Sequence, residues 1–365
     1  MTTTAVEPSR RESHPPARRR VPTGRKQWTV IGVGAAVTAV AIVVCTTVGT
    51  ANAGPVDLLR TFGIWFLGHD YPDSYRSTVV ILGDLRLPRA LLAFVGGASL
   101  SVAGVVMQGL LRNPLVSPYT LGLSSASAFG AALAIVVGRA VFGHSSLVLT
   151  IISALLCGLA VSVVVLGLAS ARKLGAATLI LLGVALSQLF EALTSGLQFF
   201  VDEDTLAEIV HWAFGSVNNA GWGQVGLVSA VLAVTLPYLL IKAAAINAIA
   251  FAGDDAATSF GINVPRTRAA TIFASVALTA VVVSFTGVIG FVGLVGPHIA
   301  RMLIGSDHRY LLPFGAITGG LLLLVADTVG RTVLSPAVIP VGIIVALVGA
   351  PIFINLIFSK RANRL

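Results

Sequence analysis

The chain alternates long apolar runs with short polar breaks through most of its length. Each run holds roughly 20 residues, which is the length that an α-helix needs to cross the hydrocarbon core of a bilayer. The runs are long and lack strict alternation of apolar and polar residues, so we expect helices rather than strands of a closed barrel. The ten predicted spans are residues 28–48, 90–108, 118–138, 147–171, 178–200, 225–243, 267–286, 288–304, 311–330 and 340–358.

Composition supports the same class of protein. Apolar residues make up 56% of the chain and charged residues only 11%, and the mean hydropathy is +0.92. A soluble domain carries about 25% charged residues. The sequence therefore predicts an all-α membrane protein with about ten transmembrane helices.

Residues 1–27 differ from the rest, because they combine seven basic side chains with little apolar content. Such a segment lacks the means to build a core, so we expect a disordered basic tail followed by a transmembrane domain over residues 28–365. A cleaved signal peptide is the alternative, since Ala51-Asn52-Ala53 resembles a cleavage site. The apolar run of about 21 residues is longer than a signal core, which favours an uncleaved first helix.

The distribution of basic residues predicts the orientation. With the tail inside and ten spans, eighteen of the 24 Lys and Arg residues fall in inside segments. Cytoplasmic loops carry an excess of Lys and Arg, so we expect a multi-pass protein of the cell membrane with both termini in the cytoplasm. The net charge of +9 then reflects topology and contact with anionic lipid. Because no basic patch is interleaved with aromatic residues, nucleic acid is not an expected partner.

Several longer motifs recur along the chain in a definite order. Arg86-Leu-Pro-Arg89 precedes the second span, and Gln108-x-x-x-Arg112-Asn113-Pro114-Leu115 separates it from the third. The later motifs are Gly287-x-x-Gly290-Phe291-Val292-Gly293-Leu294-Val295-x-Pro297-His298-x-x-Arg301, Asp307-His308-Arg309-x-Leu311-Leu312-Pro313, Ala326-Asp327-x-x-x-Arg331, Pro340-Val341-Gly342-Ile343 and Gly349-Ala350-Pro351-Ile352-Phe353. From about residue 55 to its end, the chain resembles the permease subunits of iron-siderophore and cobalamin ATP-binding-cassette importers (the FecCD type).

The resemblance implies a type II importer permease in which helices two to five and seven to ten form an inverted repeat. It also implies a second permease subunit, identical or paralogous, two cytoplasmic ATPase subunits and an extracytoplasmic substrate-binding protein. ATP and magnesium are expected on the ATPases, so this chain itself is expected to hold no cofactor, no metal and no catalytic residue. The sequence agrees, because it contains no Gly-x-x-x-x-Gly-Lys-Ser/Thr phosphate loop and no HExxH or Gly-x-Ser-x-Gly motif.

The break between the sixth and seventh spans, about residues 244–265, holds a candidate coupling loop. Asp254 or Asp255 is expected to N-cap a short helix that runs through Phe260. Gly261 suits the left-handed position after a helix, and Pro265 prevents its continuation. The resemblance implies that this knuckle seats in a groove of the ATPase, and an interfacial loop ordered by its own caps is the alternative.

A polar stripe marks the fifth span. Ser187, Glu191, Thr194 and Gln198 follow spacings of four, three and four, which places them on one helical face. Ionisable groups inside a membrane are costly and usually face an aqueous cavity. We expect this face to line the translocation pathway, with interhelical hydrogen bonding as the alternative. A proton-relay role for Glu191 is disfavoured, because no second buried acid is spaced to relay with it.

Three arginines are expected at the outer surface. Arg86 and Arg89 lie where the second helix begins, and Arg331 lies at the end of the ninth. The resemblance implies that they dock carboxylates of the binding protein, which their forked donors can grip bidentately. Local alternatives are an ion pair between Arg331 and Asp327 four residues earlier, and a pair between Arg86 and Asp84.

The expected function is that of a permease for ferric siderophore, which is the commonest cargo of the family. Cobalamin and haem are alternative cargoes, because the binding protein selects the cargo in these systems. An ion-coupled secondary transporter is the rival class, although it leaves the coupling knuckle unexplained.

Overall fold

The computed structural model describes residues 24–49, 54–67, 75–172 and 176–358, and within them it is nearly all helix, with no strand. A π-helical stretch (η2) and a 3₁₀ turn (η3) interrupt the α-helices. The elements are α1 (Gly24–Thr47), α2 (Pro55–Leu67), α3 (Arg76–Val80), η2 (Ile81–Arg86), α4 (Leu87–Leu110), η3 (Pro118–Leu121), α5 (Leu123–Phe142), α6 (Leu147–Arg172), α7 (Ala176–Phe200), α8 (Glu203–Ala213), α9 (Trp222–Ala252), α10 (Asp254–Ser259), α11 (Val264–Thr286), α12 (Val292–Ile304), α13 (His308–Thr332) and α14 (Val341–Phe358).

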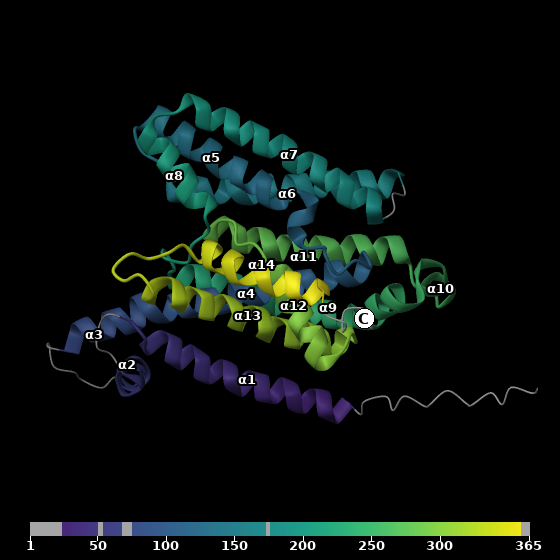
Figure 1. Ribbon diagram of the computed structural model, residues 1–365, viewed down its shortest axis with the longest axis horizontal. Helices are drawn as coiled ribbons and strands as arrows, with labels where there is room; N and C mark the ends of the chain where they lie inside the picture. Colours follow the sequence, from purple (N-terminus) through teal and green to yellow (C-terminus); the bar gives the residue numbers. More distant parts are fainter. Residues whose placement is uncertain (1–23, 50–53, 68–74, 173–175, 359–365) are drawn as a thin grey trace, which may run out of the picture.

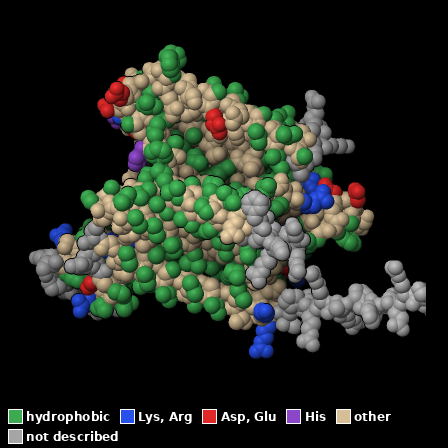
Figure 2. All heavy atoms as spheres, viewed as in Figure 1, with side chains coloured by type: hydrophobic (Ala, Val, Ile, Leu, Met, Phe, Trp, Pro, Cys, Tyr) green, Lys and Arg blue, Asp and Glu red, His purple; other side chains and the backbone are tan. Residues whose placement is uncertain are grey.

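The prediction of an all-α membrane protein is confirmed. In the described ranges, eight helical segments are long and apolar enough to cross a bilayer, and α12 and α14 are shorter apolar helices. Each of these ten overlaps one of the ten predicted spans, while α2, α8 and α10 are short helices between them. Figure 2 shows apolar side chains over the middle of the visible face and charged ones mostly toward its two ends.

The helices form two groups, and the larger group packs around a buried helix, α4 (Figure 1). One group contains α5, α6, α7 and α8, and the other contains α9 and α11 to α14 packed around α4, with α1 lying along α13. Every residue of α4 from Gly96 to Leu110 is buried. Small residues let helix backbones approach closely in a membrane protein, where lipid supplies no hydrophobic drive for helix association.

Close approach is visible at two glycines of α4. A Cβ at Gly97 would collide with the carbonyl oxygen of Gly319 in α13, and one at Gly104 would collide with that of Gly293 in α12. Gly97 and Ser101 therefore form a small-residue contact with α13, because Ser101 itself packs against Gly319. These contacts fix the position of α4, which carries candidate functional side chains at or near both of its ends.

Three predicted helix boundaries are wrong for identifiable reasons. Residues 288–291 do not begin the eighth span, because Gly287 (φ 68°) and Phe291 (φ 62°) take left-handed conformations that interrupt a right-handed helix. Residues 118–121 form a 3₁₀ turn, and the third span starts after Gly122 (φ 83°). Conversely, α9 continues to Ala252, so the coupling loop is shorter than the predicted residues 244–265.

The predicted boundary between the basic tail and the first helix is also too late in the chain. Residues 24–27 belong to the first turn of α1, where Trp28 packs edge-on against Tyr310 of α13 with ring centroids 5.7 Å apart. Arg, Lys and Gln have good helix propensity, so this contact is enough to extend the helix back to Gly24. Residues 1–23 lie outside the described residues.

Candidate functional sites

The helix α10 and its flanking turns form the candidate coupling element at one end of the bundle (Figure 1). Gly253 (φ 87°) enters it and Gly261 (φ 80°) leaves it in the left-handed region, as predicted for Gly261. The Asn263 side chain accepts a hydrogen bond from the Arg266 backbone N–H at 3.1 Å and so caps the start of α11. These turns reverse the chain within about ten residues and present α10 beyond the ends of α9 and α11.

The predicted capping role of the aspartates is wrong. Gly253 is the N-cap of α10, and no side chain caps the helix there. Asp254 instead accepts from Arg268 of α11 at 2.8 Å and lies 3.5 Å from Arg112, which follows α4. A carboxylate in the first turn of a helix interacts favourably with the helix dipole. Two nearby guanidinium groups also attract this carboxylate. Asp254 thereby ties α10 to two membrane helices.

Phe260 ends this element in an exposed position, with 71% of its surface accessible. Its neighbour Asp255 is also exposed, whereas Ala257 on the opposite face is buried against the bundle. A large aromatic side chain on a protruding turn is unfavourable in water but suits a groove on a partner. The geometry is that of a rigid knuckle with an apolar tip.

The polar stripe lies on α7, one of the least buried spans in the described part of the chain. Ser187, Thr194 and Gln198 are half-buried and Glu191 is exposed. Glu191 accepts hydrogen bonds from Ser125 of α5 and from Gln188, each at 3.1 Å. The stripe is therefore bonded in part to a neighbouring helix, and the rest of it is accessible on the surface of this single chain.

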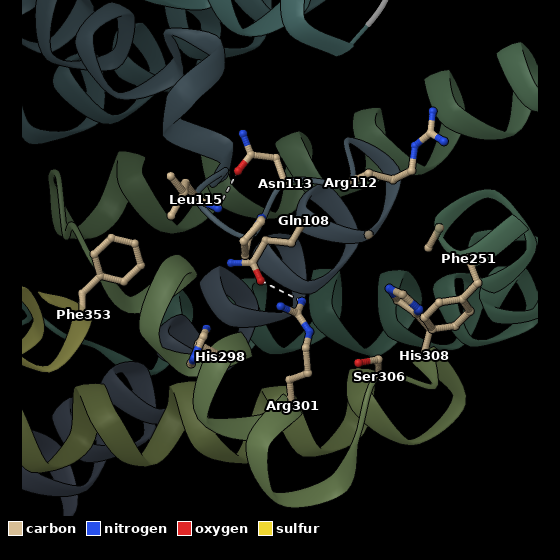
Figure 3. Close-up of a pocket in the computed structure, with 13 residues that line it drawn as sticks. Gln108, Arg112, Asn113, Leu115, Phe251, His298, Arg301, Ser306, His308 and Phe353 are labelled. Atoms are coloured by element: carbon tan, nitrogen blue, oxygen red, sulfur yellow. Dashed lines mark hydrogen bonds between the residues drawn. The ribbon is translucent and has the colours of Figure 1, made fainter. Parts of the chain in front are cut away.

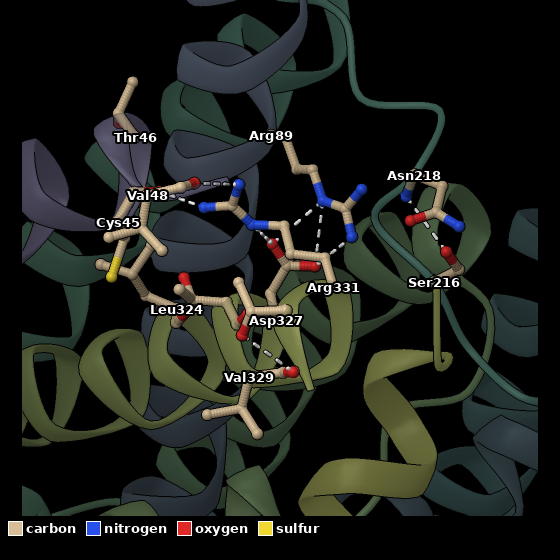
Figure 4. A network of polar contacts seen from close by, with 12 residues as sticks. Cys45, Thr46, Val48, Arg89, Ser216, Asn218, Leu324, Asp327, Val329 and Arg331 are labelled. Atoms are coloured by element: carbon tan, nitrogen blue, oxygen red, sulfur yellow. Dashed lines mark hydrogen bonds and ion pairs between the residues drawn. The ribbon is translucent and has the colours of Figure 1, made fainter. Parts of the chain in front are cut away.

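The three predicted arginines all line a cavity of about 370 Å³ at the opposite end of the bundle from α10. Figure 4 shows two of them, Arg89 and Arg331, beside Asp327. Arg89 grips Asp327 with Nε and Nη2 at 2.8 to 3.1 Å, and Arg331 lies 3.8 Å from the same carboxylate. Arg331 also donates to the carbonyls of Cys45 and Val48. The local pair predicted between Arg331 and Asp327 exists, but Arg89 holds the closer contact.

Arg86 contributes to the same cluster from the end of η2. Its guanidinium donates to the carbonyl of Thr47 at 3.0 Å. Together with the bonds from Arg331, this satisfies backbone carbonyls at the C-terminus of α1, which have no partner within the helix itself. The arginine end thus combines a buried ion pair with side-chain caps on α1.

A second cavity of about 380 Å³ lies at the α10 end (Figure 3). Arg301 of α12 projects into it and donates a hydrogen bond at 2.9 Å to the side-chain oxygen of Gln108, which lies near the end of α4. Arg112 stands at its rim. Sequence reasoning gave Arg301 and Gln108 no role, although both belong to the longer motifs of the chain.

Comparison with known proteins identifies the family to which this architecture belongs. The sequence model of the FecCD transport family matches residues 28–359. The chain belongs to the FecCD transport family. This FecCD permease is thus a subunit of an ATP-binding-cassette importer, a transport protein of the cell membrane and not an enzyme. The prediction of the family from the sequence motifs is confirmed, and the rival class of secondary transporters is excluded.

Named relatives of this FecCD permease differ in cargo. The hemin transport system permease protein of Yersinia pestis is 38% identical over 88% of this chain and 95% of its own length. The cobalamin import system permease protein of Halobacterium salinarum is 38% identical over 78% of this chain and 75% of its own length. Other relatives are named for siderophore or ferric citrate transport. The family therefore fixes the mechanism class and leaves the cargo open.

A solved structure agrees in fold. It is described as an inward-facing conformation of a metal-chelate type ABC transporter, and it matches with a TM-score of 0.76 and 32% identity, over 91% of this chain and 99% of the other. FecCD-type permeases work with ATPase and binding-protein partners. In this FecCD permease, the α10 element and the arginine cluster lie at opposite ends of the bundle.

The structure also shows contacts that no local spacing indicates. Asn247 of α9 donates to Asp307 at 2.8 Å and accepts from the His308 backbone N–H at 3.0 Å, which ties α9 to the start of α13. Burial acts to raise the pKa of Asp307, but hydrogen bonds from Arg309 and Asn247 outweigh it and hold that pKa below its ordinary value. Sixty residues separate these partners, so sequence motifs name the residues but not the pair.

Proposed function

We propose that this FecCD permease carries ferric siderophore across the cytoplasmic membrane into the cell. The proposal rests on membership of the family, together with the different chemical character of the two ends of the helix bundle. An exposed apolar knuckle lies at one end and an arginine cluster at the other. Several relatives are named for siderophore or ferric citrate transport, which supports iron chelates as the cargo class.

The knuckle is proposed to couple the permease to an ATPase. Asp254, Asp255, Phe260 and Gly261 form its turn, and the ion pairs of Asp254 with Arg112 and Arg268 give it a rigid attachment. Movement of the ATPase groove around Phe260 is thereby passed to α4 and α11. The N-terminus and C-terminus of the chain are proposed to lie on this same, cytoplasmic, side.

The arginine cluster is proposed to dock the substrate-binding protein. Because Arg89 and Arg331 share one buried carboxylate, Asp327, they carry more positive charge than their internal partner neutralises. Guanidinium groups that retain open donors suit carboxylates of an incoming protein. Arg86 borders the same cavity and completes the set.

The stripe of Ser187, Glu191, Thr194 and Gln198 is proposed to line the pathway between two permease subunits, identical or paralogous. An ionisable side chain exposed on a membrane span needs an aqueous or polar neighbour. A second permease packed against α7 would provide a shared polar passage. The apolar residues that flank the stripe would then meet lipid or the partner subunit.

The test is uptake in a strain that lacks the gene, with labelled ferric siderophore, haem and cobalamin compared side by side. Loss of siderophore uptake alone is expected, restored by the wild-type gene but not by Thr194→Trp, which narrows the pathway. The control variant is Val234→Trp, because Val234 is an exposed apolar residue on α9, away from the stripe. Uptake should require an active ATPase and survive an ionophore.

Haem is the second candidate cargo, because the hemin permease relative covers most of this chain at 38% identity. Loss of haem or cobalamin uptake with normal siderophore uptake would overturn the cargo and keep the mechanism. A pathway variant that transports at the wild-type rate would contradict the proposed role of α7.

A further inference from the structure

The cavity at the α10 end has a chemical character that neither coupling nor transport explains. It measures about 380 Å³, whereas one water molecule occupies about 30 Å³ of the liquid. It is open on one side and lies apart from the α7 stripe. Its walls come from the last turn of α4 and the segment after it, and from α9, α12, α13 and α14. The residues used below are Gln108, Arg112, Leu115, Phe251, Arg301 and Phe353.

Arg301 brings a charge into this cavity without a matching carboxylate. Its hydrogen-bond partner is the neutral Gln108 oxygen at 2.9 Å, and within the described residues no Asp or Glu forms an ion pair with it. Arg301 is half-buried, and a charge that is partly withdrawn from water is costly unless it is paired. Arg301 therefore has the electrostatic requirement for an anion at a place where the structure has room for one.

Gln108 supplies a second donor. Its side chain is 3% exposed, its oxygen is occupied by Arg301, and its Nε2 has no hydrogen-bond partner in the described part of the chain. An amide NH₂ group only donates, so it requires an acceptor. Figure 3 shows the Gln108 amide and the Arg301 guanidinium together in the cavity, with Arg112 at its edge.

The position of the cavity suits a phosphate-bearing molecule. It lies where α4, α9 and α12 end and α13 begins, which is the level of lipid headgroups if these helices span the bilayer. Phe251, Leu115 and Phe353 give it apolar walls next to the guanidinium groups. Arginine recognises phosphate through its planar fork of donors.

We propose that this cavity binds a phosphate group, either of an anionic lipid or of a soluble anion, through Arg301, Gln108 and Arg112. Arg112 also lies 3.5 Å from Asp254 of α10. A bound anion therefore competes with Asp254 for Arg112 and loosens one of the two attachments of the coupling element. The site goes beyond the proposed transport function and does not depend on the cargo.

The experiment measures binding to the full-length chain in nanodiscs of neutral lipid, so that it is separate from any transport assay. The probes are labelled inorganic phosphate, a short-chain phosphatidylglycerol, and a short-chain diacylglycerol that lacks the phosphate. The variants are Arg301→Gln and Leu115→Trp, which fills the cavity from an exposed rim position. Arg309→Gln is the matched control, because Arg309 is an exposed arginine paired with Asp307 outside the cavity.

Saturable binding of phosphatidylglycerol or phosphate is expected, and the two arms identify the source of the anion. Arg301→Gln should weaken binding of the phosphate probe at least about tenfold, as loss of a charge-assisted hydrogen bond implies. Leu115→Trp should weaken this binding as well, whereas Arg309→Gln should bind like the wild type. The proposal is overturned if the wild type binds neither phosphate probe, if diacylglycerol binds equally well, or if Arg301→Gln binds like the wild type. Should Arg301→Gln fail to fold, retained binding by Leu115→Trp overturns it.

Discussion

At the end of the bundle that holds the arginine cluster, one buried carboxylate, Asp327, pairs with two arginines, one from α4 and one from its own helix α13. Asp327 is 3% exposed and Arg89 17%, and the two form a bidentate contact across α13 and α4. Removing one member of a buried pair leaves the other charge uncompensated, which costs more than the pair itself contributes. Asp327 is therefore a structural residue at a surface whose other members are proposed to bind a partner.

Asp327→Asn should lower the free energy of unfolding by about 3 kcal/mol, because Arg89 and Arg331 would then face each other without a counter-charge. Thermal unfolding of the purified chain in detergent measures the loss. The control is Asp84→Asn, an exposed acid at the same end, for which a change within about 0.5 kcal/mol is expected. Equal melting temperatures for Asp327→Asn and the wild type would contradict this assignment.

Docking of the binding protein is tested best at Arg86, which takes no part in the Asp327 ion pairs. Arg86→Glu should weaken docking about tenfold or more, equivalent to about 1.4 kcal/mol, by replacing attraction with repulsion. Binding to reconstituted permease at two salt concentrations measures it, with Arg76→Glu, an exposed arginine at the start of α3, as the control. Unchanged affinity in Arg86→Glu, with intact wild-type salt dependence, would refute the docking role.

At the scale of elements, the connection between α9 and α11 that holds α10 is short because α9 is long. The helix α9 extends to Ala252, and at 1.5 Å per residue its 31 residues reach about 46 Å. The hydrocarbon core is about 30 Å thick. The end of α9 therefore stands outside the core and carries α10 with it, so that the knuckle is presented by rigid helices instead of a flexible loop.

Phe260→Asp should abolish association with the ATPase while the permease still inserts and folds, because a charged tip cannot enter an apolar groove. Co-purification of the two subunits from membranes is the measurement. Phe260→Leu keeps an apolar tip and should retain association, which makes it the matched control. Normal co-purification of the Phe260→Asp chain would show that α10 is an interfacial loop and not a coupling element.

At the scale of the whole molecule, the two functional ends are separated by the length of the spans. Arg86 adjoins the first turn of α4 and Gln108 lies in its last, so this one buried helix joins the arginine cluster to the cavity beside α10. Glycine contacts of α4 with α12 and α13 hold it in a close-packed core. Interiors of this density transmit displacement instead of absorbing it, which suits a device that links events on two sides of a membrane.

The orientation of the chain in the membrane follows from the same difference between its two ends, and it can be tested directly. In a chain with Cys45 and Cys157 replaced by Ala, Ser259→Cys marks the α10 end and Ala337→Cys marks the arginine end; both positions are exposed. A membrane-impermeant thiol reagent should label the cysteine at 337 in intact cells, and the cysteine at 259 only after lysis. The reverse pattern would place α10 outside and remove the basis for ATPase coupling.

The sequence alone determined the class of protein, the ten spans and the family. A chain can cross the lipid only as long apolar helices, so the hydropathy of the sequence shows where the spans lie. Where the backbone leaves the helical region, as at Gly287 and Phe291, the apolar pattern continues across the break and misplaces the boundary. Hydropathy reports the surroundings of a residue and not its dihedral angles.

Local spacing also identified the residues of the candidate sites better than it identified their partners. It placed Phe260 at the end of a short helix and Arg331 near Asp327, since both depend on residues a few positions apart. It assigned Asp254 a cap where the structure gives it Arg112 and Arg268, and it gave Arg301 no role beside Gln108. Partners 14 to 193 residues apart in the chain meet only when the helices pack, so tertiary structure alone decided which charges are paired and which charge lacks a carboxylate.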